Sequence, residues 1–182
     1  MRNIQVLRLV LIFMGCTHTH VTSQKINQFP KKTDPLHKKV EMFDKLMLGN
    51  HWNEGAIMQY VIFPPAGLDM PIIGPQADCL DPTSEMLAAY SYKYALTKDP
   101  NDRKIANEIF EAILRLEKVT GVSGLVARSF NQTDKPLWHE EVFWYNEWHQ
   151  SSSMPNYRWL GDLSADKFTS IFYGVGTFWE FC

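Results

Sequence analysis

The stretch DPTSEMLAAYSYKYAL, residues 81–96, carries the strongest structural signal in this sequence. It opens with Asp81 as a capping residue, Pro82 at the first helical position and Glu85 in the first turn. This is the usual composition of a helix start. The residues that follow are apolar almost all the way round the predicted helix. A helix without a polar face is buried on all sides, so we expect an inner helix here.

A second helix is predicted after a turn at residues 97–102. It carries one apolar stripe with charged residues opposite, which places it on the outside. The stripe consists of Ile105, Ile109, Ala112, Ile113 and Leu116. Residues 81–120 are therefore predicted to form a helical hairpin. A further buried helix is predicted over 168–181, after a capping segment at 161–166. Between them we expect a loop over 121–135 and a short helix over 138–148.

The N-terminus has the features of a secretory signal peptide over residues 1–23. Basic residues precede a short apolar run over 9–16, too short to span a membrane. Cleavage after the small residues 21–23 would leave Gln24 as the N-terminus. The mature protein would then be secreted or periplasmic. Alternatively, Gly15 and Cys16 would form a lipobox, with Cys16 carrying a lipid anchor. Residues 24–36 are predicted to be a polar linker.

Composition and motifs exclude several classes of function. The chain has 182 residues, 45% of them hydrophobic, and a formal net charge of -2, which gives no electrostatic reason to expect nucleic acid as a partner. Its three cysteines show no metal-ligand spacing and no disulfide framework. Nucleotide-binding, zinc-peptidase and nucleophile-elbow motifs are absent from the sequence. We expect no metal and no cofactor.

Several short motifs lie in and after the predicted hairpin. They are TSEMLAA (83–89), YALTKDP (94–100), LEKVTG (116–121), GLVARS (124–129) and WLGDLSAD (159–166). Together they resemble uncharacterised bacterial members of the six-hairpin glycosidase-like superfamily, over residues 76–182. The family includes glycoside hydrolases and polysaccharide lyases.

The resemblance implies an all-α fold, an (α/α)6 toroid of alternating inner and outer helices. Residues 37–182 would form part of such a toroid, with an irregular segment at their N-terminal side. The full toroid needs about twelve helices of ordinary length, whereas two hairpins are predicted here. The sequence ends at Cys182 inside an apolar helix, so we expect a fragment of a longer protein.

Four carboxylates are the candidate catalytic residues. In a toroid of this kind the starts of inner helices converge on one mouth, which would bring together Asp81, Glu85, Asp162 and Asp166. Glycosidic cleavage needs one proton-donating carboxyl and one carboxylate as base or nucleophile. Mutual repulsion should raise the pKa of at least one of the four. The alternative is that these residues only cap the helices and complement their dipoles.

Four further residues are candidates for binding the substrate. Arg128 follows an apolar run and could pair with a carboxylate of the substrate or of the protein. Trp159, and Trp138 beside His139, offer flat rings for stacking on a sugar. The alternatives are a structural salt bridge for Arg128 and core packing for Trp159.

The sequence therefore predicts an exported, carbohydrate-active protein without a membrane span. A glycoside hydrolase acting on a poly- or oligosaccharide is the first expectation. One alternative is a polysaccharide lyase acting on uronic-acid glycans. Such an enzyme would instead need a His or Tyr as base and a cation that neutralises the substrate carboxylate. The other alternative is a non-catalytic glycan-binding or scaffold fragment.

Overall fold

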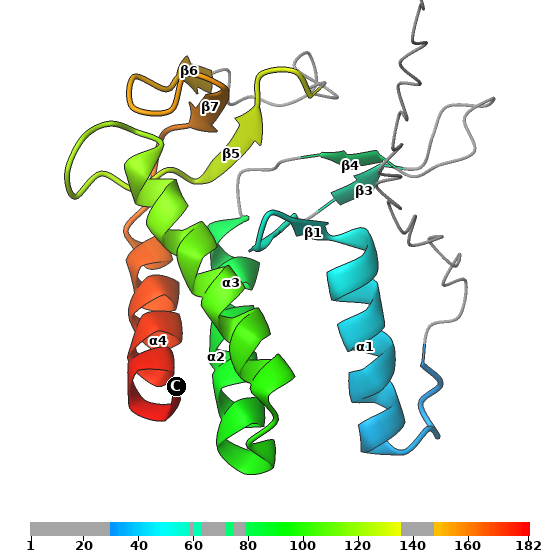
Figure 1. Cartoon of the computed structure of the whole chain (residues 1–182). Coiled ribbons are helices and arrows are strands. Elements are labelled where there is room, and N and C mark those ends of the chain that lie inside the picture. Colours follow the sequence, from blue (N-terminus) through cyan, green and yellow to red (C-terminus); the bar gives the residue numbers. More distant parts are fainter. Residues whose placement is uncertain (1–29, 59, 63–71, 75–78, 136–147) are drawn as a thin grey trace, which may run out of the picture.

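A computed structural model describes residues 30–58, 60–62, 72–74, 79–135 and 148–182 (Figure 1). These residues contain four helices and seven short strands. The helices are α1 (Leu36–Asn50), α2 (Leu80–Thr97), α3 (Pro100–Lys118) and α4 (Asp166–Phe181). The strands are β1 (Trp52–Asn53), β2 (Ala56–Ile57), β3 (Tyr60–Ile62), β4 (Ile72–Gly74), β5 (Ser129–Gln132), β6 (Trp148–Gln150) and β7 (Tyr157–Leu160).

Helices α2, α3 and α4 pack together, and α2 is in contact with both of the others (Figure 1). The predicted hairpin of α2 and α3 is present, and its tight turn has identifiable causes. Lys98 adopts a left-handed conformation with φ 55°, and Asp99 accepts a hydrogen bond from the backbone N–H of Asn101 at 2.9 Å. Asp99 thereby caps α3, with Pro100 at the first helical position. Helix α4 runs parallel to α2, so their N-termini lie at the same end.

The prediction of an all-α fold is wrong. The strands form three small antiparallel sheets, which pair β1 with β2, β3 with β4, and β7 with both β5 and β6. The largest sheet lies over the N-terminal ends of α2 and α4 (Figure 1). Its register pairs Phe130 of β5 with Trp159 of β7, and Trp159 with His149 of β6. The chain is therefore mixed α and β, and residues 129–132 are a strand where a loop was expected.

The core consists of two clusters of buried residues. One cluster joins β2, the start of α2, the C-terminal half of α3 and β5, and includes Met58, Leu80, Leu116 and Phe130. A second cluster lies between α2 and α3 and is built on Leu87, Tyr90, Ala106, Ile109 and Ile113. The stripe predicted for α3 faces this core, as expected for an amphipathic helix.

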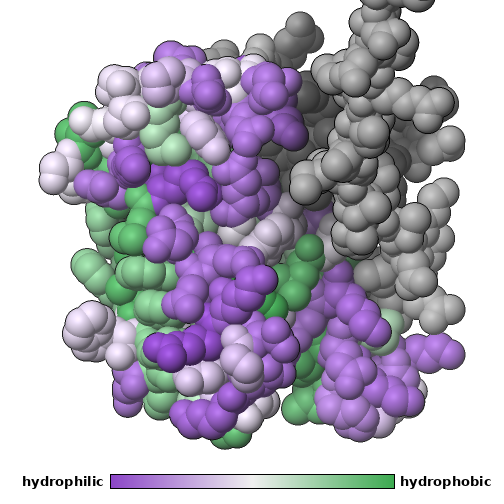
Figure 2. All heavy atoms as spheres, viewed as in Figure 1, coloured by the Kyte–Doolittle hydropathy of each residue, from purple (hydrophilic) through white to green (hydrophobic). Residues whose placement is uncertain are grey.

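The prediction that α2 and α4 are buried on all sides is also wrong. On α2, Tyr92 is 43% exposed and Leu96 is 87% exposed. On α4, Phe172 and Trp179 are 72% and 89% exposed. Figure 2 shows apolar side chains gathered along the edge formed by α4, whereas the visible face of α3 is mainly hydrophilic. Among the described residues no element covers these apolar faces, which is why the all-round apolarity does not produce burial.

Helix α1 stands beside this body and contributes no fully buried residue. Within the described ranges no helix is long and apolar enough to cross a membrane. Cys79 is buried, and neither Cys79 nor Cys182 forms a disulfide. The predicted signal peptide and Cys16 lie outside the described residues.

Candidate functional site

The N-terminal ends of α2 and α4 meet in a cluster of charged side chains. Asp81 lies in the first turn of α2, and Asp166 is the first residue of α4. The ammonium group of Lys167 forms an ion pair with Asp81 and lies 3.8 Å from the Asp166 carboxylate. The Lys167 side chain is 6% exposed, so this cation is held almost out of water. One buried ammonium group therefore connects two of the predicted carboxylates.

Arg128 and Asp162 join the cluster from the sheet side. Arg128 directly precedes β5 and is buried; its Nη1 donates to the backbone carbonyl of Asp162 at 2.9 Å. The same nitrogen lies 3.9 Å from the Asp162 carboxylate, which is 61% exposed. Asp162 adopts a left-handed conformation with φ 56°, which an Asp tolerates better than most residues. We name Asp81, Arg128, Asp162, Asp166 and Lys167 the helix-end cluster.

Neither Asp81 nor Asp162 caps a helix. Helix α2 begins at Leu80 after Cys79, and α4 begins at Asp166 after Ala165, and neither capping position makes a side-chain hydrogen bond. Asp81 and Asp166 lie in first turns, where a carboxylate complements the helix dipole. Asp162 precedes α4 by several residues. Asp81 and Asp162 therefore do not act as helix caps. Asp81 and Asp166 do lie where they complement the helix dipoles.

The pKa of Asp166 is shifted in the direction opposite to our expectation. A hydrogen bond with Ser164 lowers it, and the positive charges of Lys167 and Arg128 lower it further. Repulsion among the carboxylates was expected to raise a pKa, but that argument left out the hydrogen bond with Ser164 and the charge of Lys167. Asp166 is therefore ionised at neutral pH, so it can accept a hydrogen bond or a proton but has none to donate.

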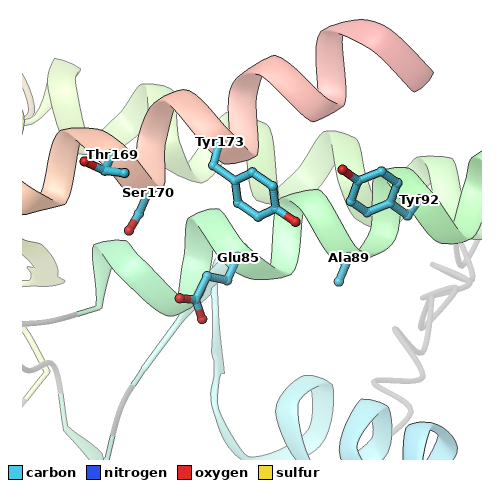
Figure 3. A pocket seen from close by; sticks show the side chains of 6 residues that line it. All are labelled: Glu85, Ala89, Tyr92, Thr169, Ser170 and Tyr173. Carbon is cyan, nitrogen blue, oxygen red and sulfur yellow. The ribbon is translucent and has the colours of Figure 1, made fainter.

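Glu85 lies one turn along α2 from Asp81 and belongs to a groove between α2 and α4. The groove has a volume of about 580 Å³. Its lining residues are Glu85, Ala89 and Tyr92 of α2, and Thr169, Ser170 and Tyr173 of α4 (Figure 3). Helical spacing places Glu85 on the same face as Asp81, and Ser170 on the same face as Asp166. The groove therefore continues from the helix-end cluster along both helices.

The predicted aromatic residues are distributed differently. Trp159 lies in β7 and is half-buried; its ring is 4.5 Å from that of His149, centroid to centroid, and it packs against the core. Core packing therefore accounts for a large part of the Trp159 ring. Trp138 and His139 lie outside the described residues.

Sequence reasoning missed Lys167, Tyr92 and Tyr173. Lys167 is the one basic residue within the apolar segment of residues 166–181, and an isolated Lys of this kind could have been taken as the partner of a carboxylate. The tyrosines were assigned to a buried helix interior. Tyr92 follows Glu85 by seven residues and Tyr173 follows Asp166 by seven residues. This spacing of about two helical turns is the signal that could have placed them on the groove.

A second polar cluster fixes the turn between β1 and β2. The Tyr157 hydroxyl donates to the Glu54 carboxylate at 2.8 Å, and Arg115 Nη1 donates to the Glu54 carbonyl at 2.7 Å. Burial and the bond to Glu54 raise the pKa of Tyr157, so its hydroxyl stays protonated. Gly55 has φ 90° and passes so close to α3 that a Cβ would meet the Glu108 carbonyl. The cluster therefore holds the turn against α3.

Among the described residues, no group of His, Cys, Asp and Glu side chains is arranged to hold a metal ion. Comparison with protein-family models, with curated proteins and with solved structures gives no match to this chain. The resemblance to the six-hairpin superfamily therefore stays a prediction, and the site has to be interpreted from its own chemistry.

Proposed function

We propose that this chain is an exported, carbohydrate-active protein that binds a poly- or oligosaccharide at the ends of α2 and α4. The observation that carries the proposal is the helix-end cluster, in which the exposed carboxylates of Asp162 and Asp166 are held beside two buried cations. Exposed carboxylates accept hydrogen bonds from sugar hydroxyls, and charge-assisted bonds are among the stronger ones. Arg128 also holds the backbone of Asp162, because it donates a hydrogen bond to the Asp162 carbonyl.

The charge balance favours a neutral or amine-bearing glycan over a uronic acid. The helix-end cluster and the adjoining groove contain four carboxylates, from Asp81, Glu85, Asp162 and Asp166, against two cations. Arg128 already contacts Asp162, and Lys167 contacts Asp81 and Asp166. Neither cation is left to neutralise a uronate without breaking a contact. The lyase alternative is the weaker one for this reason.

Glycoside hydrolysis is the catalytic form of the proposal, and the lowered pKa of Asp166 favours it. An ionised, solvent-accessible carboxylate suits the base or nucleophile of such a reaction. Such a reaction also needs a proton-donating group, and Asp162 is the other exposed carboxyl of the cluster that could take part. A binding protein needs no such division of roles, so activity assays separate the two forms.

The test combines binding and turnover. We expect Asp162→Asn and Asp166→Asn each to weaken binding of neutral oligosaccharides about tenfold, the equivalent of one charge-assisted hydrogen bond. Asp134→Asn, which removes an exposed carboxylate outside the cluster, should leave binding unchanged. Calorimetric titration measures the affinity, and release of reducing ends measures hydrolysis. Equal loss in all three variants, or no binding by the unmodified protein, would contradict the proposal.

Export is part of the proposal and rests on the apolar run and small residues of the N-terminus. The mature chain should begin at Gln24, which N-terminal sequencing of the protein from its natural source would detect. A lipid-modified Cys16 at the N-terminus would instead assign the membrane-anchored form. An intact Met1 would remove the export proposal.

A further inference from the structure

The groove between α2 and α4 is lined by a negative charge, two aromatic rings and two aliphatic hydroxyl groups. Glu85 and Ser170 lie at one end and Tyr92 lies at the other, with Tyr173 between them (Figure 3). The lining positions on α2 are spaced by four and three residues, which keeps them on one face. The groove is therefore a continuous feature of the helix pair.

Glu85 provides a negative charge that the protein itself leaves uncompensated. Its side chain is exposed and makes no hydrogen bond or ion pair within the described part of the chain. The six described residues that line the groove include no Lys, Arg or His. An anionic ligand would be repelled here, whereas a cationic one would gain an ion pair without displacing a resident cation.

The tyrosines add aromatic surface beside this charge. Figure 3 shows the phenol oxygens of Tyr92 and Tyr173 pointing toward one another. A hydrogen bond to Tyr92 raises the pKa of Tyr173, and the negative charge of Glu85 acts in the same direction. The Tyr173 phenol therefore stays neutral well into the alkaline range. Neutral tyrosine rings attract ammonium groups through the electrons of the ring face.

We infer that the groove between α2 and α4 binds the alkylammonium group of a ligand, with Glu85 as the counter-ion and the rings of Tyr92 and Tyr173 as its walls. The hydroxyl groups of Thr169 and Ser170 accept hydrogen bonds from the N–H groups of a primary amine. This inference goes beyond the proposed function, because the groove can hold a free amine whether or not a glycan occupies the helix-end cluster. An amino sugar would satisfy both sites.

The inference can be tested by titrating the protein with n-butylammonium and with n-butanol, which has a similar shape and no charge. Chemical shifts of the Tyr92 and Tyr173 ring signals report binding. Butylammonium should shift both sets, and Glu85→Gln should weaken its binding about fivefold. Glu111→Gln is the matched control, because Glu111 is an exposed glutamate on α3, away from the groove. Tyr173→Phe should retain most of the affinity and Tyr173→Leu should lose it.

A parallel titration with glucosamine and N-acetylglucosamine identifies the source of the ammonium group. Tighter binding of glucosamine than of butylammonium, dependent on Glu85, would assign an amino sugar; the reverse order would assign a free amine. Either result supports the inference. Equal binding of butylammonium and butanol, or equal losses in Glu85→Gln and Glu111→Gln, would overturn it. The butylammonium titration does not depend on carbohydrate binding, so the failure of one proposal leaves the other standing.

Discussion

Lys167 holds a positive charge in a place where a lysine is rarely found. Its side chain is 6% exposed, at the first turn of α4. Helix N-termini repel cations, and burial of an ammonium group is costly unless it is paired. Both penalties are offset by the contacts with Asp81 and Asp166. The same contacts explain why two carboxylates can lie close together. The hydrogen bond with Ser164 lowers the pKa of Asp166, and the charge of Lys167 adds to this effect.

Replacing Lys167 with Met should therefore destabilise the protein through the charge that stays behind. The Asp81 carboxylate, 25% exposed, would lose its ionic partner. We expect the free energy of unfolding to fall by about 2–3 kcal/mol. The double variant Lys167→Met with Asp81→Leu should recover part of the loss, because no unpaired charge then remains. Urea unfolding measures both values, and strictly additive losses would show that the pair is not coupled.

The close approach of α2 and α4 depends on a glycine. At Gly174 a Cβ would overlap the backbone carbonyl oxygen of Ser84. Gly176, on the same helix, has nothing within 4 Å of the corresponding position. The two glycines thus have different roles: Gly174 allows the helices to touch, and Gly176 only lowers the helix propensity of α4.

These roles predict opposite effects for the same substitution. Gly174→Ala should lower the free energy of unfolding by about 1–3 kcal/mol, because α4 has to move away from α2. Gly176→Ala should raise it by about 0.5–1 kcal/mol, because alanine loses less backbone entropy in a helix. Thermal unfolding of the two variants gives the comparison. Destabilisation by both substitutions to the same extent would show that the Gly174 contact is not specific.

The helices could be predicted from the sequence, and the strands mostly could not. The cap and proline before α3 and its apolar stripe are local signals, and they mark the helix closely. Strand β5 has the sequence Ser-Phe-Asn-Gln, with no long alternation, and is fixed by its pairing with β7 about thirty residues further on. Such pairing is non-local and leaves no signal within the strand itself. The all-α fold was therefore taken from the family resemblance, and this fold class is wrong.

The candidate site was only partly predictable for a similar reason. The carboxylates were found because acidic residues at helix starts are visible in the sequence. Lys167 was overlooked, although it is the one basic residue of an apolar segment. Its pairing with Asp81 is set by the parallel arrangement of α2 and α4, which the sequence does not show. The exposure of Tyr92 and Tyr173 could not be inferred either, since an all-round apolar helix is normally buried. The groove exists because no other described part of the chain covers these faces of α2 and α4.

At the scale of the whole molecule, α1 is joined to the helix pair by a partly buried polar network. Lys93 of α2 forms ion pairs with Asp44 of α1 at 3.0 Å and Asp102 of α3 at 3.1 Å. Burial opposes the charge on Lys93, but the hydrogen bonds to these two carboxylates prevail and raise its pKa. Tyr90, next to this network, is almost fully buried. Titratable side chains of α1, α2 and α3 therefore contact one another in this network.

This network should make the protein sensitive to alkaline pH. Burial, reinforced by the charge of Asp44, raises the pKa of Tyr90 from 10.0 to about 12. Because the folded state holds the proton more tightly, the stabilisation is complete below pH 10 and is lost as the pH rises toward 12. We expect the loss of this contribution to lower the free energy of unfolding by about 2 kcal/mol. The raised pKa of Lys93 lowers the free energy of unfolding further over the same pH range.

Urea unfolding at pH 9 and at pH 11.5, in the unmodified protein and in Tyr90→Phe, isolates the contribution of the phenol. The variant should be less stable at pH 9, where it lacks the hydrogen bond to Asp44. It should then lose less stability between the two pH values, because no buried phenol is left to ionise on unfolding. Tyr94→Phe, on the same helix and half-buried, is the control and should keep the full pH dependence. A Tyr90→Phe profile as steep as that of the unmodified protein would assign the alkaline loss to Lys93 and its carboxylates instead.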